Sequence, residues 1–101
     1  MRKIIQGKLY DTETAEILNT WTNRKPEADS DFRRKTLYRT HKGNLFLHLE
    51  TGSSSNLEFD EKDTVEDDIE PIDELTAVEF LEVHDGTEVI IQQFPDFFDE
   101  A

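Results

Sequence analysis

The sequence predicts an α+β fold, a small antiparallel β-sheet with one C-terminal helix, or a helix pair, packed on one face. Three observations support this prediction. Apolar residues alternate on both sides of Lys42-Gly43, as in a β-hairpin. Apolar residues after Asp73 recur at helical spacing, and the strand patterns all precede the helical one. The 101 residues are enough for a single domain over 1–101.

The first part of the chain predicts strands. Residues 3–12 predict a small hairpin or a kinked strand, because β-forming pairs flank the turn pair Gln6-Gly7. Residues 15–23 predict a strand through Ile17, Leu18 and Trp21, and residues 24–32 predict a polar loop.

The central hairpin is predicted to pair Lys35–Thr40 with Leu45–Thr51. If Lys42-Gly43 form a two-residue turn, one face of the hairpin points to the core and the other is at least partly wet. The predicted core face carries Tyr38, Leu45, Leu47 and Leu49, and the predicted wet face carries Arg39, Phe46 and His48.

The rest of the chain predicts a linker, an acidic segment and helices. Residues 51–56 have linker composition, and 57–70 predict a loop or an irregular edge strand. Asp73 is an N-cap candidate for a helix that ends near Gly86. Residues 87–94 favour a short helix over a strand, and 96–101 form an acidic tail. The predicted buried stripe of the first helix is Ala77, Val78, Phe80, Leu81 and His84. Glu79 and Glu82 are predicted to point outward. His84 is also predicted to be a cation at the negative end of the helix dipole.

Composition argues against several functional classes. The chain has no cysteine, so thiol chemistry and Cys-based zinc sites are excluded. It has no apolar run of about 20 residues, so no membrane partner is expected. The three histidines lack metal-ligand spacing, and the acidic run lacks the glycine of a calcium-binding EF-hand loop. We therefore expect a cytoplasmic, non-enzymatic protein with no catalytic residues, metal or cofactor.

Charge is distributed unevenly along the chain. Residues 1–49 hold ten Lys/Arg and six Asp/Glu, a net charge of +4, whereas residues 50–101 hold one Lys and eighteen Asp/Glu, a net charge of −17. Such asymmetry is typical of proteins that meet a charged partner, although a solvated acidic surface that favours solubility is the simpler explanation.

The acidic half predicts a binding surface for a basic protein. Carboxylates three or four residues apart on a helix lie about 5–6 Å from one another. Phosphates follow each other at about 3.4 Å of rise along a nucleic acid strand, so an acidic face can occupy a cationic groove built for DNA or RNA. The candidate partner-binding residues are Glu58, Asp60, Glu61, Asp63, Glu66, Asp67, Asp68, Glu70, Asp73, Glu74, Glu79 and Glu82.

Three segments resemble one known group of proteins. They are GKLYDTETAEIL at 7–18, LYRTHKGNLFLH at 37–48 and IEPIDELTAVEFLEVH at 69–84. Together they resemble a family of short proteins from bacterial phages and mobile elements, and some similar phage proteins are anti-CRISPR inhibitors. The resemblance implies a partner in the host cytoplasm, a CRISPR effector nuclease. The chain departs from the family pattern after the hairpin, where the acidic run replaces a Gly-rich loop.

Two alternatives use the same charges differently. In the first, basic residues in 24–42 of one copy meet acidic residues in 58–82 of another, which gives a homodimer or a larger homo-oligomer. In the second, Arg39 and Phe46 on the basic hairpin bind single-stranded nucleic acid. The net charge of −13 repels phosphate, so we do not expect direct nucleic acid binding.

Overall fold

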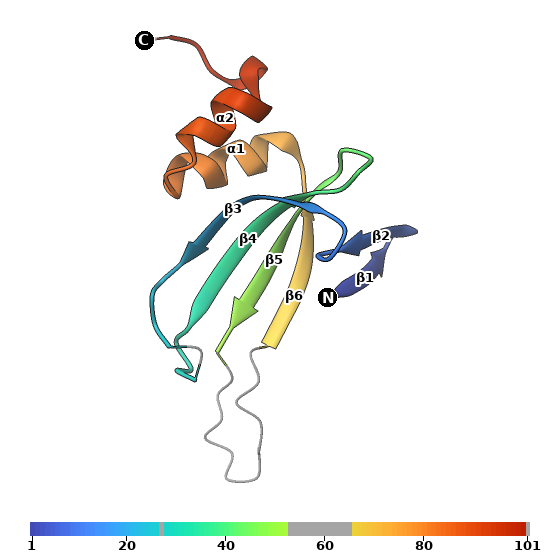
Figure 1. Ribbon diagram of the computed structural model, residues 1–101, viewed down its shortest axis with the longest axis vertical. Coiled ribbons are helices and arrows are strands. Elements are labelled where there is room, and N and C mark those ends of the chain that lie inside the picture. The colour runs from blue at the N-terminus through green and yellow to red at the C-terminus, as the bar shows by residue number, and fades with distance from the viewer. Residues whose placement is uncertain (27, 53–65, 101) are drawn as a thin grey trace.

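The computed structural model describes residues 1–26, 28–52 and 66–100. Its described strands belong to two antiparallel sheets, one of two strands and one of four, followed by two α-helices and a 3₁₀ turn (Figure 1). The predicted α+β class is therefore confirmed. The elements are β1 (Arg2–Ile5), β2 (Lys8–Asp11), β3 (Glu16–Thr22), β4 (Arg33–Arg39), β5 (Leu45–Thr51), β6 (Glu66–Ile72), α1 (Glu74–Val83), α2 (Thr87–Gln93) and η1 (Pro95–Phe97).

The N-terminal segment forms the predicted hairpin. β1 and β2 pair from Arg2 opposite Asp11 to Ile5 opposite Lys8. Gln6 and Gly7 connect them with φ angles of 51° and 78°. Positive φ at both central residues is the condition for a type I′ turn, which matches the twist of the two strands.

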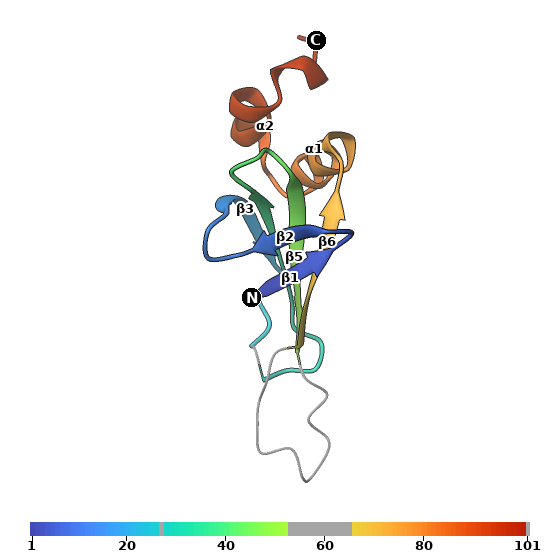
Figure 2. The ribbon, with the colours of Figure 1, turned by 90° about the vertical axis from the view of Figure 1, so that its right-hand side faces the viewer.

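The main sheet has the strand order β3-β4-β5-β6, with every neighbouring pair antiparallel. The predicted strand in 15–23 is confirmed as β3. The connection between β3 and β4 contains no strand among its described residues, in agreement with the predicted polar loop. The helical elements lie together at one end of this sheet, and the β1–β2 hairpin lies across it below them (Figure 2).

The predicted register of the central hairpin is wrong by one residue. Tyr38 pairs with Phe46, and Leu37 pairs with Leu47. The N–H of Thr40 donates to the carbonyl of Asn44 at 2.8 Å, and Gly43 has a φ of +88°. The loop therefore has three residues rather than two, with glycine at the left-handed position.

This shift moves the side chains of β4 to the faces opposite to those predicted, because side chains alternate along a strand, whereas Leu45 and Leu47 of β5 keep the predicted core face. Tyr38 leaves the predicted core face, and Phe46 and His48 are buried rather than wet. Both faces of the sheet carry a core. The first contains Leu37, Leu45 and Leu47 with buried residues of both helices, and the second contains Tyr10, Tyr38, Phe46 and Ile69. The second core was not predicted, because it forms only where the β1–β2 hairpin packs over the sheet, and no local pattern indicates that contact.

α1 follows the prediction closely. The carboxylate of Asp73 accepts a hydrogen bond from the Thr76 N–H at 2.8 Å, as expected of an N-cap. Four residues of the predicted stripe, Ala77, Val78, Phe80 and Leu81, are buried, and the fifth, His84, is half-buried. Residues 87–93 form a helix, which confirms the preference for helix over strand.

The predicted C-cap needs a correction. Asp85, with a φ of +62°, takes the left-handed position, and Gly86 has a negative φ. The Gly86 N–H donates to the Leu81 carbonyl at 2.7 Å, the long bond of a Schellman motif. Glycine is favoured at 86 because a Cβ there would lie 2.8 Å from Leu81 Cβ, an atom that cannot move without the helix backbone.

Two segment predictions are corrected in part. Of the two alternatives predicted for 57–70, residues 66–70 take the edge strand rather than the loop, and this strand is regular and continues to Ile72, with Pro71 opposite Phe46. Residues 53–65 lie outside the described residues. In the predicted linker, Thr51 belongs to β5 and Gly52 is buried, its N–H donating to the Phe32 carbonyl at 2.9 Å.

Candidate partner-binding surface

The structure describes part of the predicted acidic surface. Glu58, Asp60, Glu61 and Asp63 lie outside the described residues, and Glu66 is described only as the first backbone position of β6. The other candidates fall on β6, at the start of α1 and along α1. They are Asp67, Asp68, Glu70, Asp73, Glu74, Glu79 and Glu82.

Two carboxylates of β6 are already paired within the molecule. Asp67 Oδ2 lies 3.1 Å from His48 Nε2, and Asp68 Oδ1 accepts a hydrogen bond from Lys3 Nζ at 2.6 Å. The hydrogen bond from Lys3 and a further one from the Ile69 N–H lower the pKa of Asp68. Both side chains are exposed, so the Asp68–Lys3 pair is screened by solvent and stabilises the fold little. These two acids connect β6 to its neighbours before any partner is bound.

Asp73 also has a structural role. The Thr76 hydrogen bond to its carboxylate lowers the pKa of Asp73. Because that bond satisfies an otherwise unpaired donor of the first helical turn, Asp73 is committed to the start of α1. It is therefore a weaker candidate for contact with a partner than its sequence position indicates.

The remaining four acids, Glu70, Glu74, Glu79 and Glu82, are exposed. Glu79 and Glu82 point away from the core, as predicted. β6 has seven residues, so its first residue lies about 20 Å from its last. Since α1 starts beyond the far end of that strand, the predicted acids do not form one compact patch. Those of α1 belong to a separate end of the molecule.

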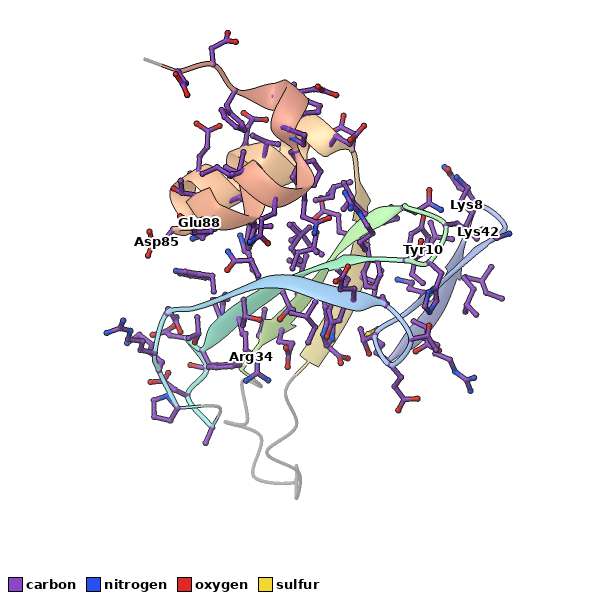
Figure 3. All side chains as sticks on the ribbon, turned by 45° about the horizontal axis from the view of Figure 1, so that its top comes forward. Lys8, Tyr10, Arg34, Lys42, Asp85 and Glu88 are labelled. Atoms are coloured by element: carbon purple, nitrogen blue, oxygen red, sulfur yellow. The ribbon has the colours of Figure 1, made fainter. Side chains whose placement is uncertain are left out.

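That end carries more acids than the prediction included. We call residues 73–100, with α1, α2 and η1, the helical layer. It contains nine Asp/Glu and no Lys or Arg. Figure 3 shows Asp85 and Glu88, which the prediction omitted, close together at one end of this layer. The other omitted acids are Asp96, Asp99 and Glu100. Within the described residues, no ion pair reaches any of the nine carboxylates.

The helical layer also has an apolar groove of about 290 Å³. Ile91, Phe97 and Phe98 are exposed there, at 47%, 39% and 43% of their surfaces. The acidic aromatic tail was the sequence signal that could have indicated this groove. We define the helical groove by its lining residues, Val78, Glu82, Thr87, Ile90, Ile91, Phe97 and Phe98.

The other face of the sheet carries a chain of charged groups across β4, β5 and β6. Arg34 binds Glu50 through two hydrogen bonds of 2.9 and 2.6 Å. His48 lies between two acids, with Nδ1 3.6 Å from Glu50 and Nε2 3.1 Å from Asp67. Burial and the nearby charge of Glu50 raise the pKa of Tyr38 beside them. The groups satisfy one another, so this chain joins three strands and leaves no obvious reactive group.

The structure argues against single-strand binding through Arg39 and Phe46. Phe46 has no exposed surface. Arg39 donates to Gln93 of α2, and its guanidinium carbon lies 5.3 Å from the centroid of the Phe94 ring. The two side chains face opposite cores, so no basic aromatic strip exists at this position.

Within the described part of the chain, no group of three or more His, Asp or Glu residues could hold a metal ion. No helix among these residues is long and apolar enough to cross a membrane. In comparisons with known proteins, no family model, no curated protein and no solved structure matches the chain.

Proposed function

We propose that this chain is a non-enzymatic inhibitor that uses its acidic surface to bind a basic, nucleic-acid-binding protein. The single observation that carries the proposal is the helical layer, with nine carboxylates, no Lys or Arg and an open apolar groove. A solvated face that serves only solubility needs no exposed aromatic residues, because these lower solubility. Acids around an apolar groove fit a partner surface that is both basic and partly apolar.

The proposed mechanism is occlusion. Carboxylates of Glu70, Glu74, Glu79 and Glu82 would take the places of phosphates in a cationic groove, while the helical groove covers apolar surface beside it. The charge would steer association and make it sensitive to salt. The resemblance to phage proteins supports a CRISPR effector nuclease as the target and the bacterial cytoplasm as the location.

The test is a plasmid-interference panel in cells that carry different CRISPR systems. We expect the protein to restore transformation by a targeted plasmid in at least one system. A variant with Glu70→Lys, Glu79→Lys and Glu82→Lys should lose this rescue, because each change places a like charge against the basic groove. Lys is well tolerated on an edge strand and near a helix C-terminus, so the variant is expected to fold.

A matched control reverses two exposed acids away from the surface, Glu13→Lys and Glu16→Lys. It should rescue as well as the parent. Equal rescue by the triple variant, with circular dichroism matching the parent, would show that these carboxylates do not mediate inhibition. No rescue in any system would remove the CRISPR effector as the target.

Self-association is the second candidate function, and one observation favours it. Arg24, Lys25 and Arg33 lie in or beside the β3–β4 connection, at the end of the main sheet away from the helical layer (Figure 1). Residues 24–35 hold five Lys/Arg and three Asp/Glu, so this end has a small excess of positive charge, which favours head-to-tail contact with the acidic helical layer of another copy. Light scattering at 20 and 500 mM NaCl tests this candidate. A monomer at both concentrations would exclude it.

A further inference from the structure

A cleft of about 350 Å³ lies between the β1–β2 hairpin and the loop joining β4 and β5. It shares no residue with the helical groove. Residues 7–14 form one side and residues 40–44 form the other, so two segments far apart in the sequence meet here. Its volume is typical of the smaller ligand sites in proteins. The lining residues used below are Lys8, Asp11, Thr14, Thr40, His41 and Lys42.

The cleft is lined by two lysines that make no ion pair with any described residue. Lys8 lines it from the start of β2 and Lys42 from the loop between β4 and β5, and both lie at the same end of the molecule (Figure 3). Within the described residues neither makes an ion pair, although Lys3 pairs with Asp68 and Arg34 with Glu50. The chain has 24 Asp/Glu for 11 Lys/Arg, so carboxylates are abundant. Two positive charges that line one cleft favour the binding of an anion there.

The other polar groups of the cleft define the ligand further. Thr14, Thr40 and His41 can donate hydrogen bonds to phosphate oxygens. Asp11 is buried, and its Oδ1 accepts from the Glu13 N–H at 2.9 Å, which fixes the carboxylate. A carboxylate beside an anion site repels a bare phosphate, but it accepts hydrogen bonds from the hydroxyl groups of a sugar. The cleft can therefore bind a molecule that has a phosphate group for the two lysines and hydroxyl groups for Asp11.

We propose that this cleft binds a small phosphate monoester that carries hydroxyl groups, of the size of a sugar phosphate or a mononucleotide. The Lys8 and Lys42 ammonium groups hold the phosphate, and the Asp11 carboxylate accepts from the hydroxyl groups. The site is independent of the proposed inhibitor function, because it lies outside the acidic surface and the helical groove.

The experiment titrates the ¹⁵N-labelled full chain with ribose 5-phosphate and adenosine 5′-monophosphate, followed by amide resonances. We expect saturable shifts at residues 7–14 and 40–44. The double variant Lys8→Gln, Lys42→Gln should weaken binding about tenfold or more, because it removes both positive charges that hold the phosphate. The control Arg24→Gln, Lys25→Gln removes the same charge elsewhere and should bind like the parent.

Three results would overturn the proposal. The first is no saturable shift at millimolar ligand. The second is equal weakening by the control variant, which would indicate a long-range charge effect. The third is equal or tighter binding of inorganic phosphate or of a short single-stranded oligonucleotide, which would show that the cleft does not recognise a small hydroxylated ester. Rescue in the interference panel by the Lys8→Gln, Lys42→Gln variant would show that inhibition does not depend on the cleft.

Discussion

Trp21, Phe80 and His84 form an aromatic cluster where β3 meets α1. The ring centroid of His84 lies 4.9 Å from that of Trp21 and 4.5 Å from that of Phe80. Burial, and to a smaller extent the charge of Lys35, lower the pKa of His84. The position of His84 in the sequence predicted a cation at the negative end of the helix dipole. That expectation is wrong, because packing against two rings favours the neutral imidazole more than the dipole favours the charged one.

The first prediction follows from the sign of this shift. The unfolded chain takes up a proton at His84 near pH 6.5, before the folded chain does. The stabilisation is therefore complete above pH 6.5 and is lost as the pH falls through the lowered pKa. Thermal unfolding followed by circular dichroism at pH 7.5, 6.5 and 5.5 should show a falling Tm.

The His84→Phe variant keeps an aromatic ring but has no titratable group at this position. Its Tm should therefore fall less over this pH range than the Tm of the parent. His41→Gln, at an exposed position, serves as the control and should fall like the parent. An identical pH dependence in the parent and the His84→Phe variant would contradict the role assigned to His84.

At the scale of elements, the β1–β2 hairpin stays on the sheet through one central aromatic side chain. Phe46 has no exposed surface, with its ring centroid 5.4 Å from that of Tyr10 and 5.0 Å from that of Tyr38. A two-stranded hairpin is marginally stable alone in water. The second core therefore determines whether β1 and β2 remain in place, and with them the lysine cleft.

The second prediction concerns this core. Phe46→Ala should lower the free energy of unfolding by about 3–5 kcal/mol, because it removes a fully buried ring and leaves a cavity. Urea unfolding measures the loss. Amide hydrogen exchange should show faster exchange in β1 and β2 than in β4.

The control for this variant is Leu9→Ala, since Leu9 is 56% exposed in the same hairpin. Its effect should stay below about 1 kcal/mol. Unchanged protection of β1 and β2 in the Phe46→Ala variant would show that contacts outside the second core hold the hairpin.

At the scale of the whole molecule, charge repulsion opposes the fold. The chain has a net charge of −13, and its helical layer has nine acids with no basic residue to offset them. Like charges held together in the folded state repel one another more strongly than in the expanded unfolded chain. Charge repulsion therefore makes the helical layer less stable than its packing alone would. A bound cation-rich partner would relieve this repulsion.

The third prediction is that salt stabilises the protein. The Debye length falls from about 30 Å at 0.01 M to about 3 Å at 1 M, so added NaCl should raise the Tm. A variant with Glu79→Gln, Glu82→Gln and Glu88→Gln should have a higher Tm at low salt and a smaller salt dependence. A Tm that falls with salt would instead show that ion pairs such as Lys3–Asp68 dominate.

The sequence by itself determined the elements whose signals are local. Gln6-Gly7 specified the first turn, Asp73 the start of α1, and the 77–81 stripe its buried face, because turns, caps and helical periodicity depend on neighbours a few residues away. The excess of acid on the β6 and α1 side was equally visible in the sequence.

Only the tertiary structure decided what depends on long-range contacts. The one-residue change at the 40–44 loop placed Tyr38 on the same face as Phe46, and the β1–β2 hairpin then covered this face. Packing also lowered the pKa of His84 and brought Asp67 and Asp68 to partners on other strands, His48 and Lys3. It joined Lys8 and Lys42, which are 34 residues apart, in one cleft. The pairing of distant segments depends on how their side chains pack together in the two cores. Local sequence patterns carry little information about that packing.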